Sequence, residues 1–436
     1  MIDGAFVPWL LAGIPLLGAL TSLVVWSSPD RLKLSSIIWS VISLVAMAGL
    51  SGQIVTPPEG LLPLYLLPLA AIASLLGQPV HKDHRLSWVM TLACLGFGIG
   101  TLTGHEVSSQ LFLMGLLISI ILLLQRHHTA FWPISWWGIG LFGLAVLCVG
   151  ITALAGPPLS SIASLLTCTI LLPLLPFHDG YLTALTRLPG CLPSFIVLLL
   201  PVIGLHELSP VISTVPDVVA WTVSLFALGG ALYGAIKALA QSRVRLLLAY
   251  GSLSFFSMLW WFVASSRTAT PRAALFVVAI GLATSGLLIA WQAIRTRYGD
   301  DVDPQSISGL ASVMPQYAVL LSLLALAAMG LPPFGVFAGF MGLLLTSPLL
   351  SSVGWCITLI AWLAASWYIM QMVQQLLFGV RRLDLRYSDV RHSELASLLI
   401  LLLTLLALGL APADMLAPDQ NGNRTDTVME SLTWNR

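Results

Sequence analysis

Two histidine–carboxylate pairs are the residues of this chain best suited to acid–base chemistry. His178 is followed by Asp179, and His206 is followed by Glu207. An imidazole changes charge near neutral pH and a neighbouring carboxylate can orient its ring, so either pair could accept and release protons. The sequence favours a simpler role for each. His178 would cap backbone groups exposed by a helix break, and the other pair would be solvated at an outer helix end.

Three basic residues are further candidates for an ion pathway. Lys237 would reach the membrane interface from a helix end. Arg243 and Arg245 could close a pathway electrostatically or pair with an acidic group on a partner subunit, and setting the orientation of the chain is an equally good explanation. No cysteine or histidine spacing indicates a metal site, and no motif indicates an organic cofactor or a nucleophile. We therefore predict no catalytic chemistry in this chain itself.

The elements that must position these residues are transmembrane helices. Of the 436 residues, 58% are hydrophobic and only 8% are charged, whereas soluble domains carry roughly a quarter charged residues. Most of the outer surface must therefore face a lipid bilayer. A net charge of +1 gives no basis for binding nucleic acid. We predict an all-α integral membrane protein.

About fourteen apolar segments are long enough to span a bilayer, which takes roughly 17–25 residues each. The segment 315–349 exceeds one straight helix and is interrupted by Pro332 and Pro333, which remove backbone donors and break the helix. We count it as one broken crossing. The predicted spans are 5–27, 33–53, 60–78, 86–104, 107–125, 130–155, 158–176, 193–209, 217–239, 245–265, 273–293, 315–349, 353–378 and 394–412.

Counting 315–349 as one crossing also gives a consistent charge pattern. Nearly all basic residues between the predicted spans then fall on one side, as expected for the cytoplasmic side of a bacterial inner membrane. Both termini are predicted to lie on the opposite side, outside. Residues 1–412 form a single polytopic membrane domain, and residues 413–436 form a polar tail for docking or a disordered segment.

Three segments carry a family resemblance. They are Pro173-Leu174-Leu175-Pro176-Phe177-His178, then Ala238–Gln241 with Arg245–Ser252, and finally Gly330-Leu331-Pro332-Pro333-Phe334. In their order and spacing they resemble the antiporter-like subunits shared by respiratory complex I, membrane-bound hydrogenases, multi-subunit cation/proton antiporters and inorganic-carbon uptake systems.

The resemblance implies two five-helix repeats related by inverted symmetry, within a family-like core at about residues 86–378. Each repeat contains a broken helix, with the break at Pro173 and Pro176 in the first and at Pro332 and Pro333 in the second. Broken helices recur in transporters because they expose backbone groups and helix ends to a polar pathway. A subunit of this kind works beside other membrane and soluble subunits, and can form part of an ion-translocating enzyme complex.

The chain departs from the family where the family carries ionisable residues. Leu171, Val202 and Phe340 stand at positions where the family has lysine or glutamate inside the membrane. Gly115 aligns with a glutamate of an earlier helix, and Arg243 stands where the family has an acid. Because a proton relay through a bilayer needs groups that bind and release protons, we predict that the chain's own proton channel is degenerate.

Three functions remain open at this point. The leading hypothesis is a membrane subunit of a multi-subunit proton- or cation-coupled transport complex. The alternative is a membrane anchor in an inorganic-carbon uptake complex, in which a soluble zinc-containing partner does the chemistry on carbon dioxide or bicarbonate. The third is a stand-alone secondary transporter for a neutral substrate, which would work without partners.

Overall fold

Helices account for all the regular secondary structure that is described. Eleven helices within the described ranges are long and apolar enough to cross a membrane. The all-α integral membrane fold predicted from composition is confirmed. The predicted tail at 413–436 lies outside the described residues. The computed structural model describes residues 6–50, 58–126, 136–298, 307–346, 353–379 and 388–411.

Six long helices precede the first break in the chain. α2 begins at Pro29, four residues before the predicted start, because proline suits the first helical turn and Asp30 is favourable near a helix N-terminus. This extension places Lys33 inside the helix. The bounds are α1 (Val7–Val24), α2 (Pro29–Leu50), α3 (Pro58–Gly77), η2 (Lys82–His84), α4 (Arg85–Thr103), α5 (Glu106–Arg126) and α6 (Trp136–Leu154).

The first broken helix consists of α7 (Leu159–Leu171) and α8 (Asp179–Arg187). The structure places Pro173 and Pro176 in the segment between them. A proline lacks the backbone donor that a continuing helix needs, and its ring clashes with the preceding turn. The helix of the predicted span 158–176 therefore ends at Leu171, and α8 follows beyond that span.

The second broken helix consists of α14 (Pro315–Ala328) and α15 (Gly335–Thr346). Pro332 and Pro333 lie in the segment between them, as expected from the same backbone constraint. The two halves occupy the stretch 315–349 that was too long for one straight helix. The broken helices of the predicted fold are therefore present at both places.

The two breaks occupy equivalent positions in two successive sets of five crossings. The first set is α4, α5, α6, the α7–α8 pair and α9, and the second is α10, α11, α12, the α14–α15 pair and α16. The fourth crossing is the broken one in each set. Because five crossings end on the opposite side of the membrane, the second set starts inverted relative to the first, in agreement with the predicted inverted repeats. The remaining bounds are α9 (Leu192–Ile212), α10 (Asp217–Leu239), α11 (Val244–Ser266), α12 (Pro271–Tyr298), α13 (Leu310–Val313), α16 (Val353–Leu377) and α17 (His392–Leu410).

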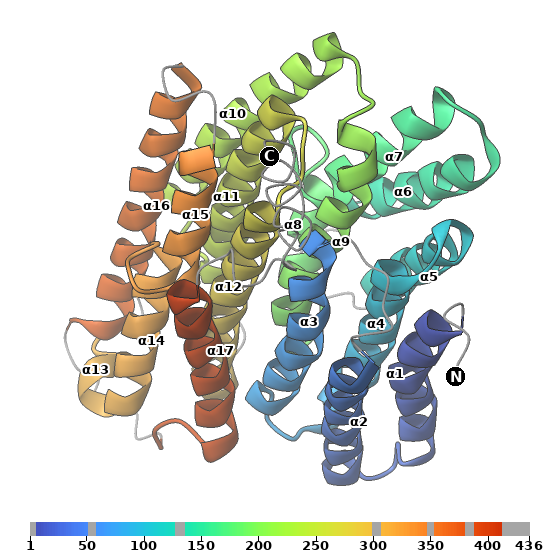
Figure 1. The fold of residues 1–436 in the computed structure, drawn as a ribbon. Coiled ribbons are helices and arrows are strands. Elements are labelled where there is room, and N and C mark those ends of the chain that lie inside the picture. The colour runs from blue at the N-terminus through green and yellow to red at the C-terminus, as the bar shows by residue number, and fades with distance from the viewer. Residues whose placement is uncertain are drawn as a thin grey trace, which may run out of the picture.

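α12 forms the centre of the bundle. Its most apolar window is entirely buried, and it packs against α3, α9, α11, α14, α15 and α17. Figure 1 shows α1, α2, α4 and α5 on one side of this central helix and α13 to α16 on the other. Outer helices expose large apolar side chains such as Leu20 and Val45, which suit contact with lipid.

Backbone groups at both breaks are hydrogen-bonded within the protein. The indole nitrogen of the buried Trp260 in α11 donates to the carbonyl oxygen of Leu172 at 2.8 Å. At the second break, the amides of Gly330 and Leu331 donate to carbonyls in the last turn of α14. These bonds replace the partners that a continuous helix would supply, which hydrocarbon cannot provide.

Gly330 offers a direct test of the second break. Its φ of 73° lies in the left-handed region, and a Cβ at this position would overlap the indole of Trp362. The substitution Gly330→Ala should lower the free energy of unfolding by about 2 kcal/mol or more, because both effects act together. The measurement is thermal or denaturant unfolding of the purified protein in mild detergent.

Gly140→Ala is the matched control. Gly140 lies in α6, and a Cβ there would meet no atom within 4 Å. This change should leave stability unchanged or raise it by about 0.5–1 kcal/mol, because alanine is the better helix former. Equal effects of the two substitutions would show that the second break does not depend on Gly330.

Candidate functional site

His178 stands at the first break, immediately before α8. Its side chain is buried, and Nδ1 lies 3.3 Å from the carbonyl oxygen of Pro176, to which it donates when that nitrogen is protonated. Nε2 lies 3.8 Å from the Asp179 carboxylate, whose side chain is 44% exposed. The imidazole thus contacts the Pro176 carbonyl, a backbone group that the break leaves outside the helices, and the carboxylate of Asp179.

Aromatic rings of α10 and α11 extend this cluster. The ring of Tyr233 packs edge-on against His178 with centroids 5.4 Å apart, and Tyr250 packs against Tyr233 at 6.1 Å. The ammonium of Lys237 lies 5.7 Å from the centroid of the Tyr233 ring. The structure therefore gathers His178, Asp179 and Lys237, three of the candidate ion-pathway residues, around Tyr233. We call these residues, with Tyr250, the first-break cluster.

His206 and Glu207 lie elsewhere, within α9. The sequence favours a solvated pair at the outer end of this helix, whereas α9 runs on to Ile212 and both residues are partly buried. The Ser109 hydroxyl of α5 lies 3.3 Å from a carboxylate oxygen of Glu207. The pair therefore faces a neighbouring helix rather than open solvent alone.

Arg243 and Arg245 are separated by the start of α11. Arg243 is exposed at the N-cap, whereas Arg245 is partly buried. The guanidinium of Arg245 donates to the Thr186 carbonyl at 3.3 Å, the Gly190 carbonyl at 3.4 Å and the Gln292 side chain at 2.9 Å. Arg245 therefore ties the end of α8 and the following turn to α12.

The Arg245 contacts belong to a longer row of polar groups, which we call the polar belt: Lys33, Gln78, Ser87, Arg245 and Gln292. The Lys33 ammonium donates to the Gln78 carbonyl at 2.5 Å. The Ser87 hydroxyl lies 3.2 Å from both the Gln78 side-chain oxygen and the Pro189 carbonyl, next to the Arg245 contacts. The belt joins α2, α3, α4, α11 and α12 at one end of the bundle.

A thiol and a buried ion pair lie near this end. Burial raises the pKa of the Cys191 thiol to about 12, so it adds no charge at neutral pH. Arg297 and Glu394 form an ion pair at 2.7 Å, with side chains only 6% and 1% exposed. Sequence reasoning missed Gln78, Ser87 and this pair. Arg297 contributes only to the charge pattern between the predicted spans, and no local spacing connects α12 with α17.

The positions at which family relatives carry charge are apolar and packed. Leu171 and Val202 are buried in the main hydrophobic core. Phe340 of α15 stacks on Trp362 of α16 with ring centroids 3.8 Å apart and an angle of 20° between the planes. A Cβ at Gly115 would lie 2.7 Å from the Phe97 ring. None of these four positions offers a group that titrates.

Comparison with known proteins assigns the fold to a family. Residues 86–367, from the start of α4 into α16, match the family described as NADH:quinone oxidoreductase/Mrp antiporter, transmembrane. The match covers more than half of the chain and contains both five-helix sets and both breaks. The chain therefore belongs to this family of antiporter-like membrane subunits.

Individual relatives are distant. The F(420)H(2) dehydrogenase subunit M of Methanosarcina mazei is 26% identical over 382 residues, covering 84% of this chain and 76% of that one. The NADH-quinone oxidoreductase subunit M of Escherichia coli is 29% identical over 217 residues, covering 48% of this chain and 42% of that one. The second alignment thus spans less than half of either chain.

Solved structures support the same fold. A chain of the Mrp complex from Dietzia sp. matches with a TM-score of 0.79 at 16% identity, covering 95% of this chain and 96% of that one. A chain of respiratory complex I from Thermus thermophilus matches with a TM-score of 0.73 at 16% identity, covering 93% and 98%. These likenesses show a shared helical architecture.

The two arginines of α11 provide a matched stability test of the polar belt. Arg245→Met should lower the free energy of unfolding by about 2 kcal/mol, because it removes hydrogen bonds from a charged donor to partly buried oxygens. Arg243→Met removes the same charge from an exposed position and should change stability by no more than about 0.5 kcal/mol. Unfolding in mild detergent measures both, and equal losses would contradict the positioning role of Arg245.

Proposed function

We propose that this chain is a membrane subunit of a multi-subunit complex that couples proton or cation movement to another process. Its family, with both helix breaks kept in place, supports the proposal. The names of its relatives support the same proposal, since each is a subunit of a dehydrogenase or an oxidoreductase, or a chain of the Mrp complex or of respiratory complex I.

We further propose that the chain's own proton pathway is closed. The observation that carries this proposal is the stack of Phe340 on Trp362 beside the second break, together with the buried Leu171 and Val202. Aromatic and aliphatic side chains cannot hold the protons that a relay must pass on. The 3.8 Å between the stacked rings of Phe340 and Trp362 also leaves no room for water between them.

A residual ion pathway through this chain would run through the first-break cluster. Among the residues described within the two five-helix sets, it brings a histidine, a carboxylate and an ammonium group close together. We assign no step of proton movement to the other candidates, His206, Glu207, Arg243 and Arg245. The pair of His206 and Glu207 faces α5, and Arg245 holds a turn in place. We propose that the cluster organises the break rather than moves protons.

We also propose an orientation for the chain. The basic residues of the polar belt, Lys33 and Arg245, gather at one end of the bundle. The positive-inside rule makes this the cytoplasmic end in a bacterial inner membrane, with both termini outside. Residues 1–412 would then form one membrane domain around the family core, and 413–436 would be free to dock on another subunit.

A mild-detergent pull-down of the tagged chain with mass spectrometry tests the subunit assignment. We expect stoichiometric recovery of redox subunits, or of several small membrane subunits as in a cation antiporter. A single large soluble zinc protein would instead favour the membrane anchor of an inorganic-carbon uptake complex. Recovery of the chain alone and monodisperse would contradict the proposal and favour a stand-alone transporter.

A further inference from the structure

A small cavity lies beside the second helix break, in the middle of the bundle. Side chains of α11, α12, α14, α15 and α16 line it, and its volume is about 20 Å³. A cavity can hold a water molecule once this volume reaches roughly 10–15 Å³. The space therefore suits one water molecule and is too small for an organic substrate.

One wall of the cavity carries a hydroxyl that has no hydrogen-bond partner among the described residues. Tyr368 of α16 is 2% exposed, and no group of the described residues lies within hydrogen-bond distance of its phenolic oxygen. Burying a hydroxyl without a hydrogen bond is unfavourable, so nearly all such groups are paired with protein or with ordered water. The Tyr368 hydroxyl therefore requires a partner that the protein itself does not supply.

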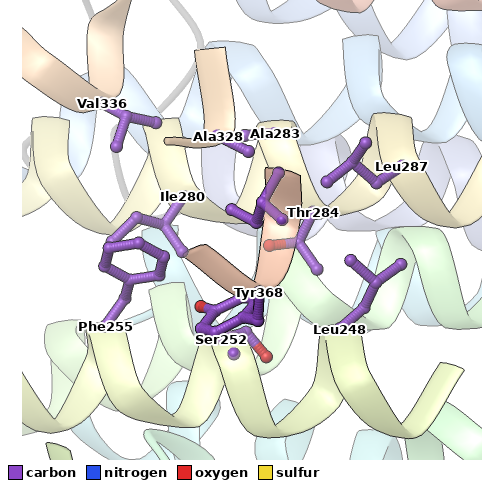
Figure 2. A pocket seen from close by; sticks show the side chains of 12 residues that line it. Leu248, Ser252, Phe255, Ile280, Ala283, Thr284, Leu287, Ala328, Val336 and Tyr368 are labelled. Carbon is purple, nitrogen blue, oxygen red and sulfur yellow. The ribbon is translucent and has the colours of Figure 1, made fainter. Parts of the chain in front are cut away.

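Two further hydroxyl-bearing side chains line the same cavity (Figure 2). The Ser252 hydroxyl of α11 donates to the Ala249 carbonyl at 2.9 Å and lies 3.0 Å from the Tyr181 hydroxyl. A hydroxyl oxygen has two lone pairs, so Ser252 can accept a further hydrogen bond. Thr284 of α12 contributes a third side chain that can donate or accept.

We propose that this cavity holds one ordered water molecule, hydrogen-bonded to Tyr368, Ser252 and Thr284. Three polar partners match the number that buried waters commonly have. The water would join α11, α12 and α16 next to the break between Ala328 and Val336, both of which line the cavity. It is a binding site beyond the proposed function, because it needs neither partner subunits nor a proton gradient.

The lining of the cavity determines what this water can do. All twelve residues that line it are uncharged: apart from the three hydroxyl-bearing side chains they are leucine, isoleucine, valine, alanine, glycine and phenylalanine. None of these side chains titrates near neutral pH, so the water has no neighbour with which to exchange a proton there. It acts as a fixed bridge that supplies hydrogen bonds across the second break.

A cryo-electron microscopy map of the intact complex, at a resolution that shows ordered waters elsewhere in the membrane domain, tests the site. We expect a density peak between the Tyr368 hydroxyl and Ser252, and its loss in Tyr368→Phe. A wild-type map of that quality without the peak would overturn the inference. A continuous file of waters reaching either membrane face would contradict the closed pathway while leaving this site intact.

Stability gives a second test with a matched control. Ser257 also has a buried hydroxyl without a partner among the described residues, but it does not line the cavity. Ser257→Ala removes an unpaired group and should raise the melting temperature. Tyr368→Phe removes a group paired with water and should lower it by about 2 °C. A rise with Tyr368→Phe, like that of the control, would show that the cavity is dry.

Discussion

A helix that stops inside a bilayer leaves amide and carbonyl groups that hydrocarbon cannot hydrogen-bond, and the architecture of this protein follows from that constraint. The first break packs against α11 and the second against α12, the two most buried of the long helices. Trp260 of α11 supplies the donor that Leu172 lacks, and the turn at Gly330 closes the second break. α11 thus has a second role as the source of a hydrogen bond for the first break.

The same buried positions decide what the breaks can do. The family resemblance predicts lysine or glutamate beside the breaks, whereas here Phe340 and Trp362 stack at one of them and Leu171 ends α7 at the other. At one end of the bundle, Arg297 and Glu394 form a buried pair and Arg245 fixes a turn. The helical fold of the family is kept, while the positions beside the breaks, Leu171 and Phe340, are packed with apolar side chains.

Apolar segment lengths and the prolines of the second break are local signals, so the spans and that break could be predicted from the residues themselves, whereas the first break and the repeat were implied by the family resemblance. Contacts between distant segments could not. Arg297 and Glu394 are 97 residues apart, and only the packing of α17 on α12 brings them together. Tyr233 joins His178 to Lys237 through ring contacts that no motif encodes. The contact between Glu207 and Ser109 of α5 likewise depends on the packing of distant helices.

The most direct test of the closed pathway is proton flux through this chain alone. The purified protein would be sealed in vesicles carrying a pH gradient and a pH-sensitive dye, with protein-free vesicles as the reference. The account predicts a rate of gradient decay no faster than in protein-free vesicles. Faster decay that is abolished by His178→Ala would contradict the account and make the first-break cluster a working proton pathway.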